Sequence, residues 1–204
     1  MLALGPHPDD IELGAGATIH KFVRDGSEVD AVIFSDCKDA VPPGWPPDSI
    51  REECELSMRR LGVARTIILD FKNKLLSLDR QSILDFLYEI RSAKYDLVLV
   101  GSSYSSHQDH IVVTEEARRA FRGVSIWGYN LPNSDYNFIT GIYVLVSAED
   151  VDAKIDSIST YKSQFELKRP YFNLDALKAT LLSNGVEIGH VYAERFENIR
   201  QVVK

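Results

Sequence analysis

Short apolar runs alternate along the chain with amphipathic stretches. Five runs of β-branched and aliphatic residues are short enough to be buried strands: Leu2–Gly5, Val29–Ser35, Thr66–Phe71, Leu97–Gly101 and Ile142–Ser147. Between them, residues 12–24, 49–61 and 80–93 repeat apolar side chains at helical spacing. The alternation of strand and helix predicts an α/β fold, a Rossmann-like three-layer sandwich with a mostly parallel central sheet.

Two irregular loops interrupt this pattern. Residues Ala40–Asp48 hold four of the eight prolines, and proline lacks the N–H that a helix or strand interior needs. We expect this loop to lie over the C-terminal edge of the sheet as a pocket wall. Residues Asn130–Gly141 form a second such loop, and the alternating tail at 186–200 is predicted to end as a strand or strand pair. The length of 204 residues predicts one domain spanning 1–204.

The charge balance excludes several classes of partner. The formal net charge of −7 disfavours nucleic acid, and we find no basic patch that would override it. No apolar run reaches the roughly 18 residues of a membrane helix, and the N-terminus lacks a signal-peptide layout. Cys37 and Cys54 are too few and too far apart for a disulfide framework or a cysteine metal site. We therefore expect a soluble cytoplasmic protein without membrane insertion, and leave a homo-oligomer open.

Three of the five histidines lie in two acid-rich clusters. The first cluster, residues 5–10 (GPHPDD), follows the first predicted strand, and the second, residues 105–110 (SSHQDH), follows the fourth. In an open α/β sheet, ligands bind beyond the carboxyl ends of the strands where strand order reverses. In the common 3-2-1-4 order the first and fourth strands are neighbours at that reversal. The two clusters are therefore expected to face each other across one crevice.

The residue types in these clusters suit a hydrolytic metal site. A catalytic zinc typically takes three protein ligands and keeps one position for water, and His7, Asp10 and His110 can supply them. Asp9 points differently from Asp10, so it can stay unligated and take a proton from the water, whose pKa the metal lowers to about 7. A protonated His107, oriented by Asp109, can face the oxyanion formed when hydroxide attacks a carbonyl. Together these roles describe hydrolysis of an amide or ester.

Simpler interpretations exist for each part. His-Pro-Asp-Asp can be a turn whose Asp caps the next helix, and His107 and His110 can be solvent-facing residues at a helix start. Their joint occurrence after two strands that should be adjacent favours the metal site. Arg51 is either a helix-surface charge or a contact for substrate hydroxyls or phosphate. Gly14 and Gly16 do not complete a nucleotide-binding loop and are interpreted as close helix packing.

The stretch HPDDIELGAGATI from position 7, with SSHQDH from position 105, resembles the two signatures of the PIG-L/LmbE-like zinc deacetylases, AHPDDxELGxGGTI and HPDH. The likeness continues at residues 51–63, 161–164 (YKSQ) and 192–196 (YAERF). The resemblance implies a Rossmann-like enzyme that removes an acetyl group from an N-acetylated amino sugar or glycoconjugate such as N-acetylglucosamine. It also implies His7, Asp10 and His110 on zinc, Asp9 as general base, and His107 as electrostatic partner held by Asp109.

The sequence departs from the family pattern near the substrate. Gln108 replaces the proline of the second signature, and residues 70–74 (DFKNK) lack the Pro-Asp-Gly-like turn that many relatives use. These changes leave two alternatives open: a hydrolase of another amide, or a non-catalytic sugar- or nucleotide-binding protein on the same fold. Zinc is the expected ion, and another divalent ion such as Fe²⁺ is also compatible with these ligands.

Overall fold

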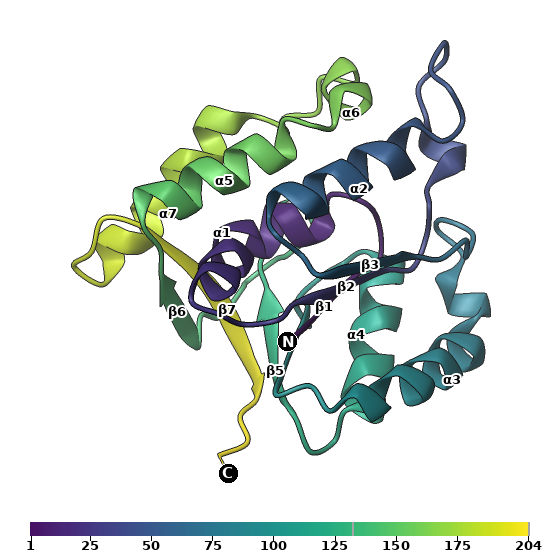
Figure 1. Cartoon of the computed structure of the whole chain (residues 1–204), viewed down its shortest axis with the longest axis horizontal. Helices are drawn as coiled ribbons and strands as arrows, with labels where there is room; N and C mark the ends of the chain where they lie inside the picture. The colour runs from purple at the N-terminus through teal and green to yellow at the C-terminus, as the bar shows by residue number, and fades with distance from the viewer. Residues whose placement is uncertain (132, 204) are drawn as a thin grey trace.

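The computed structural model describes residues 1–131 and 133–203 and shows a sheet enclosed between two helical layers (Figure 1). The seven strands that these residues form run in the order β3-β2-β1-β4-β5-β7-β6. Strands β1 to β5 are parallel, and β7 pairs antiparallel with both β5 and β6. The predicted α/β sandwich with a mostly parallel sheet is confirmed. The strands are β1 Leu2–Gly5, β2 Asp30–Ile33, β3 Arg65–Ile68, β4 Leu97–Gly101, β5 Ser125–Tyr129, β6 Ile142–Leu145 and β7 Ala193–Arg200.

Helices cover both faces of the sheet (Figure 1). One layer contains α1 Asp10–Arg24, α2 Ser49–Arg60, α5 Ala148–Ile158, α6 Lys162–Glu166 and α7 Leu174–Glu187. The other contains α3 Arg80–Ile90 and α4 Gln108–Ala120, and short 3₁₀ turns lie at Lys38–Ala40, Leu76–Leu78 and Arg91–Ala93. Because strand side chains alternate, Leu2 and Leu4 of β1 join the core under α3 and α4, whereas Ala3 joins the core under α1. No helix of the described residues is long and apolar enough to cross a membrane.

The predicted strands agree with the structure best in the centre of the sheet. β1 and β4 have the predicted bounds, whereas β2, β3 and β6 are shorter than predicted. The positive φ angles of Gly26 and Gly62 follow the ends of α1 and α2, as helix-terminating glycines adopt. The predicted tail strand is confirmed as β7, but its first residues belong to α7 instead. Strand β5 and helices α5 to α7 were absent from the sequence prediction.

The strand order creates the expected switch point. β1 lies between β2 and β4, with Leu2 opposite Val98 and Ala3 opposite Leu99 across the β1–β4 pair. The chain leaves β1 into α1 on one face of the sheet and leaves β4 into α4 on the other (Figure 1). The loops after these two strands therefore diverge around one crevice.

Gly14 lets α1 approach the sheet. A Cβ atom at Gly14 would lie 2.2 Å from Cδ2 of Tyr129, a fully buried residue whose hydroxyl donates to the carbonyl oxygen of Leu4 at 2.8 Å. Overpacking in Gly14→Ala is expected to lower the free energy of unfolding by about 1–3 kcal/mol. The higher helix propensity of alanine offsets roughly 1 kcal/mol of this loss.

Urea unfolding can measure this effect, with Gly123→Ala as the matched control because a Cβ at Gly123 meets no atom within 4 Å. A Gly14→Ala protein as stable as the wild type would contradict the packing role.

Candidate active site

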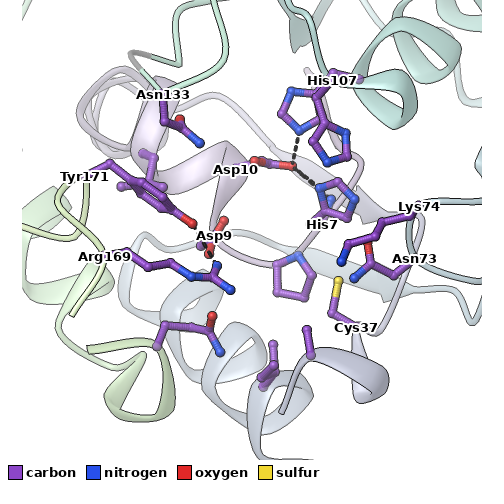
Figure 2. A pocket seen from close by; sticks show the side chains of 16 residues that line it. His7, Asp9, Asp10, Cys37, Asn73, Lys74, His107, Asn133, Arg169 and Tyr171 are labelled. Carbon is purple, nitrogen blue, oxygen red and sulfur yellow. Dashed lines mark hydrogen bonds and ion pairs between the residues drawn. The ribbon is translucent and has the colours of Figure 1, made fainter. Parts of the chain in front are cut away.

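The two histidine clusters meet at one cavity of about 220 Å³ (Figure 2). His7 to Asp10 form the turn between β1 and α1, while His107 caps α4, which carries His110 one turn later. Residues about a hundred positions apart thus share a cavity because β1 and β4 are paired. The described residues that line it are His7, Pro8, Asp9, Asp10, Leu13, Cys37, Ala40, Ile50, Asn73, Lys74, His107, His110, Asn133, Gln164, Arg169 and Tyr171.

Asp10 lies between two imidazoles. Its Oδ2 atom is 3.1 Å from Nδ1 of His7 and 3.3 Å from Nε2 of His110. Bonds of about 2.0–2.2 Å to a tetrahedral cation place neighbouring ligand atoms about 3.3–3.6 Å apart. The two contacts are close to this spacing, so Asp10 can share one ion with each histidine after a small adjustment. The positive charge of His110 and hydrogen bonds from both rings outweigh burial and hold the pKa of Asp10 far below its usual range, so this carboxylate is ionised.

A second carboxylate orients His7. The opposite ring atom, Nε2, donates to Oδ2 of the fully buried Asp109 at 2.9 Å. Burial lowers the pKa of His7, but hydrogen bonds to Asp10 and Asp109 outweigh it and raise that pKa to about 10. A histidine whose second nitrogen donates to a carboxylate is typical of metal ligands, because that bond fixes the ring and increases its basicity.

The contact of Asp109 differs from the sequence prediction, which assigned its side chain to His107. The Asp109 carboxylate instead accepts from His7 and from the backbone N–H groups of Lys74, at 2.7 Å, and Leu76, at 3.3 Å. The two backbone N–H groups belong to the segment after β3, and their hydrogen bonds fix the position of the Asp109 carboxylate. His107 is oriented by the Asp109 backbone, whose N–H donates to Nδ1 of His107 at 3.2 Å.

His107 is a neutral donor rather than a charged one. Burial, followed by the positive charges of His110 and His7, lowers the pKa of His107 to about 4. Because Nδ1 accepts a backbone hydrogen bond, the ring proton of the neutral form resides on Nε2. The expectation of a protonated His107 is therefore replaced by a neutral N–H donor at the cavity wall.

Asp9 does not use its carboxylate to cap α1. It occupies the N-cap position, but its backbone is left-handed, with φ 88°, and its side chain makes no capping hydrogen bond. A capping aspartate normally has extended backbone and bonds the first turn, so the helix-cap interpretation does not fit. Burial, followed by the negative charges of Asp10 and Glu12, raises the pKa of Asp9 well above its usual value. These are properties of a carboxyl group suited to proton transfer.

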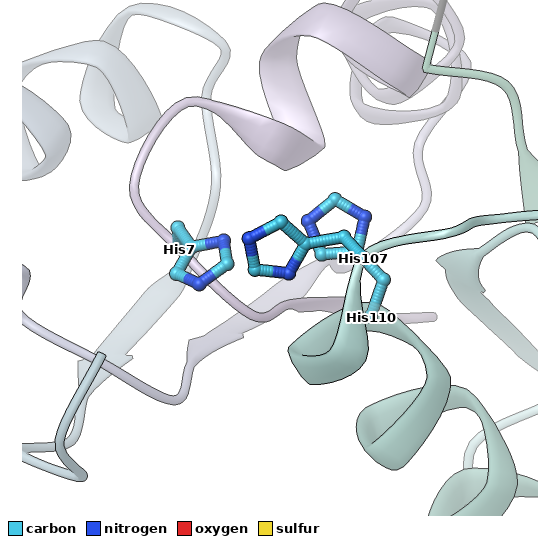
Figure 3. A group of neighbouring side chains, drawn as sticks. All are labelled: His7, His107 and His110. Atoms are coloured by element: carbon cyan, nitrogen blue, oxygen red, sulfur yellow. The ribbon is translucent and has the colours of Figure 1, made fainter. Parts of the chain in front are cut away.

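A second donor set includes all three clustered histidines. One ring nitrogen from each of His7, His107 and His110 lies within 4.8 Å of the others (Figure 3). Asp10 lies beside this group, since one of its oxygens is at hydrogen-bond distance from His7 and His110. A mixture of imidazole and carboxylate donors suits a borderline divalent cation such as zinc. The residues present therefore fit such an ion at Asp10.

Arg51 does not reach this cavity. Its guanidinium donates to the carbonyl oxygen of Ile68 at 3.3 Å and lies 3.5 Å from Glu55. The preceding residue, Ile50, lines the cavity instead. Arg51 is not among the described residues that line the cavity, and its contact with substrate stays a prediction.

The C-terminal segment contributes cavity residues that the sequence did not reveal. Arg169 and Tyr171 follow α6, and Arg169 donates to the Tyr171 hydroxyl at 2.7 Å. The guanidinium points toward Asp9 (Figure 2), and its positive charge acts on that carboxylate. Neither a motif nor a periodic pattern marks these positions. Each of the two predicted loops supplies one wall residue, Ala40 and Asn133.

A family model for GlcNAc-PI de-N-acetylases, PIG-L, matches residues 2–121, which is more than half of the chain and includes both histidine clusters. The chain belongs to the PIG-L family. A PIG-L relative, the diacetylchitobiose deacetylase of Thermococcus kodakarensis, is 26% identical over 95% of this chain and 80% of its own length.

Solved structures share the fold at lower identity. The conserved protein TT1542 of Thermus thermophilus superposes with a TM-score of 0.85 and 23% identity, covering 100% of this chain and 95% of the other. A 4-carboxy-2-hydroxymuconate hydratase from Pseudomonas putida gives a TM-score of 0.81 and 17% identity, over 100% and 97%. These likenesses establish the fold. Because a hydratase shares it, the fold alone does not identify the reaction.

Proposed function

We propose that this chain is a zinc-dependent N-deacetylase that hydrolyses the acetamide of an amino sugar or glycoconjugate. The observation that carries the proposal is the Asp10 Oδ2 atom, which lies 3.1 Å and 3.3 Å from the nitrogens of two histidines, next to an Asp9 whose carboxylate does not cap the helix. Membership of the PIG-L family supports the acetamide. The relative named for diacetylchitobiose supports an amino-sugar substrate.

Each side chain has a role that follows from its contacts. His7, Asp10 and His110 would hold the ion, which when bound would acidify water and polarise the amide carbonyl. Asp9, with its raised pKa, accepts a proton from the nucleophile and returns it to the leaving amine. Neutral His107 donates its Nε2–H to the carbonyl oxygen as negative charge develops. Asp109 does not contact substrate but holds His7 in place.

The cavity also favours a polyhydroxylated substrate. Arg169, Lys74, Asn133 and Gln164 add charged or amide hydrogen-bonding groups to its wall. Such groups can bond sugar hydroxyls in several directions, whereas the ring of Tyr171 offers an apolar face. Two alternatives are hydrolysis of a different amide and sugar binding without catalysis, and an assay of acetate release distinguishes both from the proposal.

Acetate release from metal-loaded protein tests the proposal. Zinc-loaded protein is expected to release acetate from N,N′-diacetylchitobiose, to lose that activity after chelation, and to regain it on addition of zinc. N-acetylalanine, an acetamide without a sugar, is the comparison substrate. Equal or faster hydrolysis of N-acetylalanine would favour a different amide. Saturable binding of the sugar without any acetate release would favour a non-catalytic protein.

Asp109 provides a separate test of the metal site. Asp109→Asn is expected to weaken zinc affinity by about 10- to 100-fold, because a neutral amide no longer fixes and polarises His7. Competition with a chromogenic chelator measures the affinity, and Glu115→Gln is the control, because Glu115 of α4 is half-exposed and pairs with Arg118. An unchanged zinc affinity in Asp109→Asn would show that His7 needs no such support.

A further inference from the structure

The left-handed backbone of Asp9 is held by a contact from a distant part of the chain. A non-glycine residue with φ 88° is strained and requires support from its surroundings. The Asp9 N–H donates at 3.0 Å to the hydroxyl of Tyr161, which lies between α5 and α6. The phenol belongs to a residue 152 positions away, so the conformation at the start of α1 depends on tertiary structure.

The Tyr161 hydroxyl is itself fixed by Glu12. It donates to Oε1 of Glu12 at 2.5 Å, and both side chains are fully buried. The second Glu12 oxygen, Oε2, has no hydrogen-bond partner among the described residues. Since Glu12 lies in the first turn of α1, the chain of bonds runs from the Asp9 amide through Tyr161 back to the same helix. The phenol oxygen accepts one bond and donates another, as its chemistry permits.

We propose that Tyr161, supported by Glu12, is a positioning residue that holds Asp9 in the left-handed conformation required of the general base. The inference rests on the function proposed above. Without the phenol, the Asp9 backbone can relax toward an ordinary N-cap conformation. In that conformation an aspartate carboxylate bonds the first helical turn instead of facing the cavity. Glu12 thereby acquires a role: it accepts the hydrogen bond that orients the phenol.

Tyr161→Phe tests this role because it removes only the hydroxyl. We expect kcat to fall about 10- to 100-fold, the effect of a slightly misplaced catalytic group, with KM and zinc content unchanged. Tyr129→Phe is the matched control, since it also removes a buried phenol bond, to the Leu4 carbonyl, and Tyr129 is not among the described residues that line the cavity. It is expected to lower stability and leave kcat unchanged.

The conservative variant Glu12→Gln keeps an acceptor for the phenol and is expected to retain kcat within about threefold, whereas Glu12→Leu should lose as much as Tyr161→Phe. The double variant Glu12→Leu with Tyr161→Phe should lose little more kcat than either single variant, because both substitutions break the same chain of hydrogen bonds. A Tyr161→Phe enzyme with wild-type kcat, or a kcat loss matched by Tyr129→Phe, would overturn the inference.

A crystal structure of Tyr161→Phe decides the inference even if no substrate is turned over. We expect the Asp9 φ angle to leave the left-handed region in that structure. An Asp9 backbone that keeps its positive φ without the phenol would refute the positioning role, whereas absent acetate release in the wild type would refute only the proposed function.

Discussion

Asp10→Ala is expected to abolish zinc binding. The substitution removes the one oxygen that lies at hydrogen-bond distance from both His7 and His110, and two imidazoles alone are a poor ligand set for a hydrolytic ion. We expect zinc content after dialysis to fall from about one ion per chain to near zero. Acetate release should fall to background with it.

Metal analysis of purified protein measures this effect directly. Asp39→Ala, which removes an exposed carboxylate from another loop at the carboxyl edge of the sheet, is the control and should keep its zinc. A zinc content near one ion per chain in Asp10→Ala would mean that His7, His107 and His110 hold the ion together.

Asp9→Asn is expected to lower kcat by about 10²- to 10⁴-fold, the usual contribution of a general base. Asparagine has nearly the same shape and also tolerates left-handed backbone, so the turn before α1 should be preserved. Its amide cannot accept the proton that the mechanism transfers. Zinc content and thermal stability should therefore stay at wild-type levels.

Steady-state kinetics with diacetylchitobiose, together with metal analysis, separates this loss from a loss of zinc. If zinc-loaded Asp9→Asn retained a kcat within about threefold of wild type, the base would have to be another group.

The sequence predicted the part of the fold that strong local patterns encode. β1 and β4 are uninterrupted apolar runs in the sheet centre, and their bounds matched the prediction. β5 was missed because its five residues include Gly128 and polar Ser125, so the run does not resemble a buried strand. Helix α6 has only five residues, too few for a helical period to be recognised.

The candidate site was predictable in composition but not in its contacts. The motif spacing and the 3-2-1-4 strand order placed both clusters in one crevice, as the β1–β4 pair confirms. The partner of Asp109 could not be read from sequence, because it depends on two backbone amides in the loop after β3. Arg169 and Tyr171 enter the cavity through the packing of the C-terminal segment, which no local pattern encodes.

Anomalous diffraction from a zinc-loaded crystal tests the central claim most directly. We expect one peak in the cavity, at about 2.0–2.2 Å from Nδ1 of His7, Oδ2 of Asp10 and Nε2 of His110, with the Asp9 carboxylate outside bonding distance. A zinc peak bound by His107 in place of Asp10, or no peak in this cavity, would contradict the account.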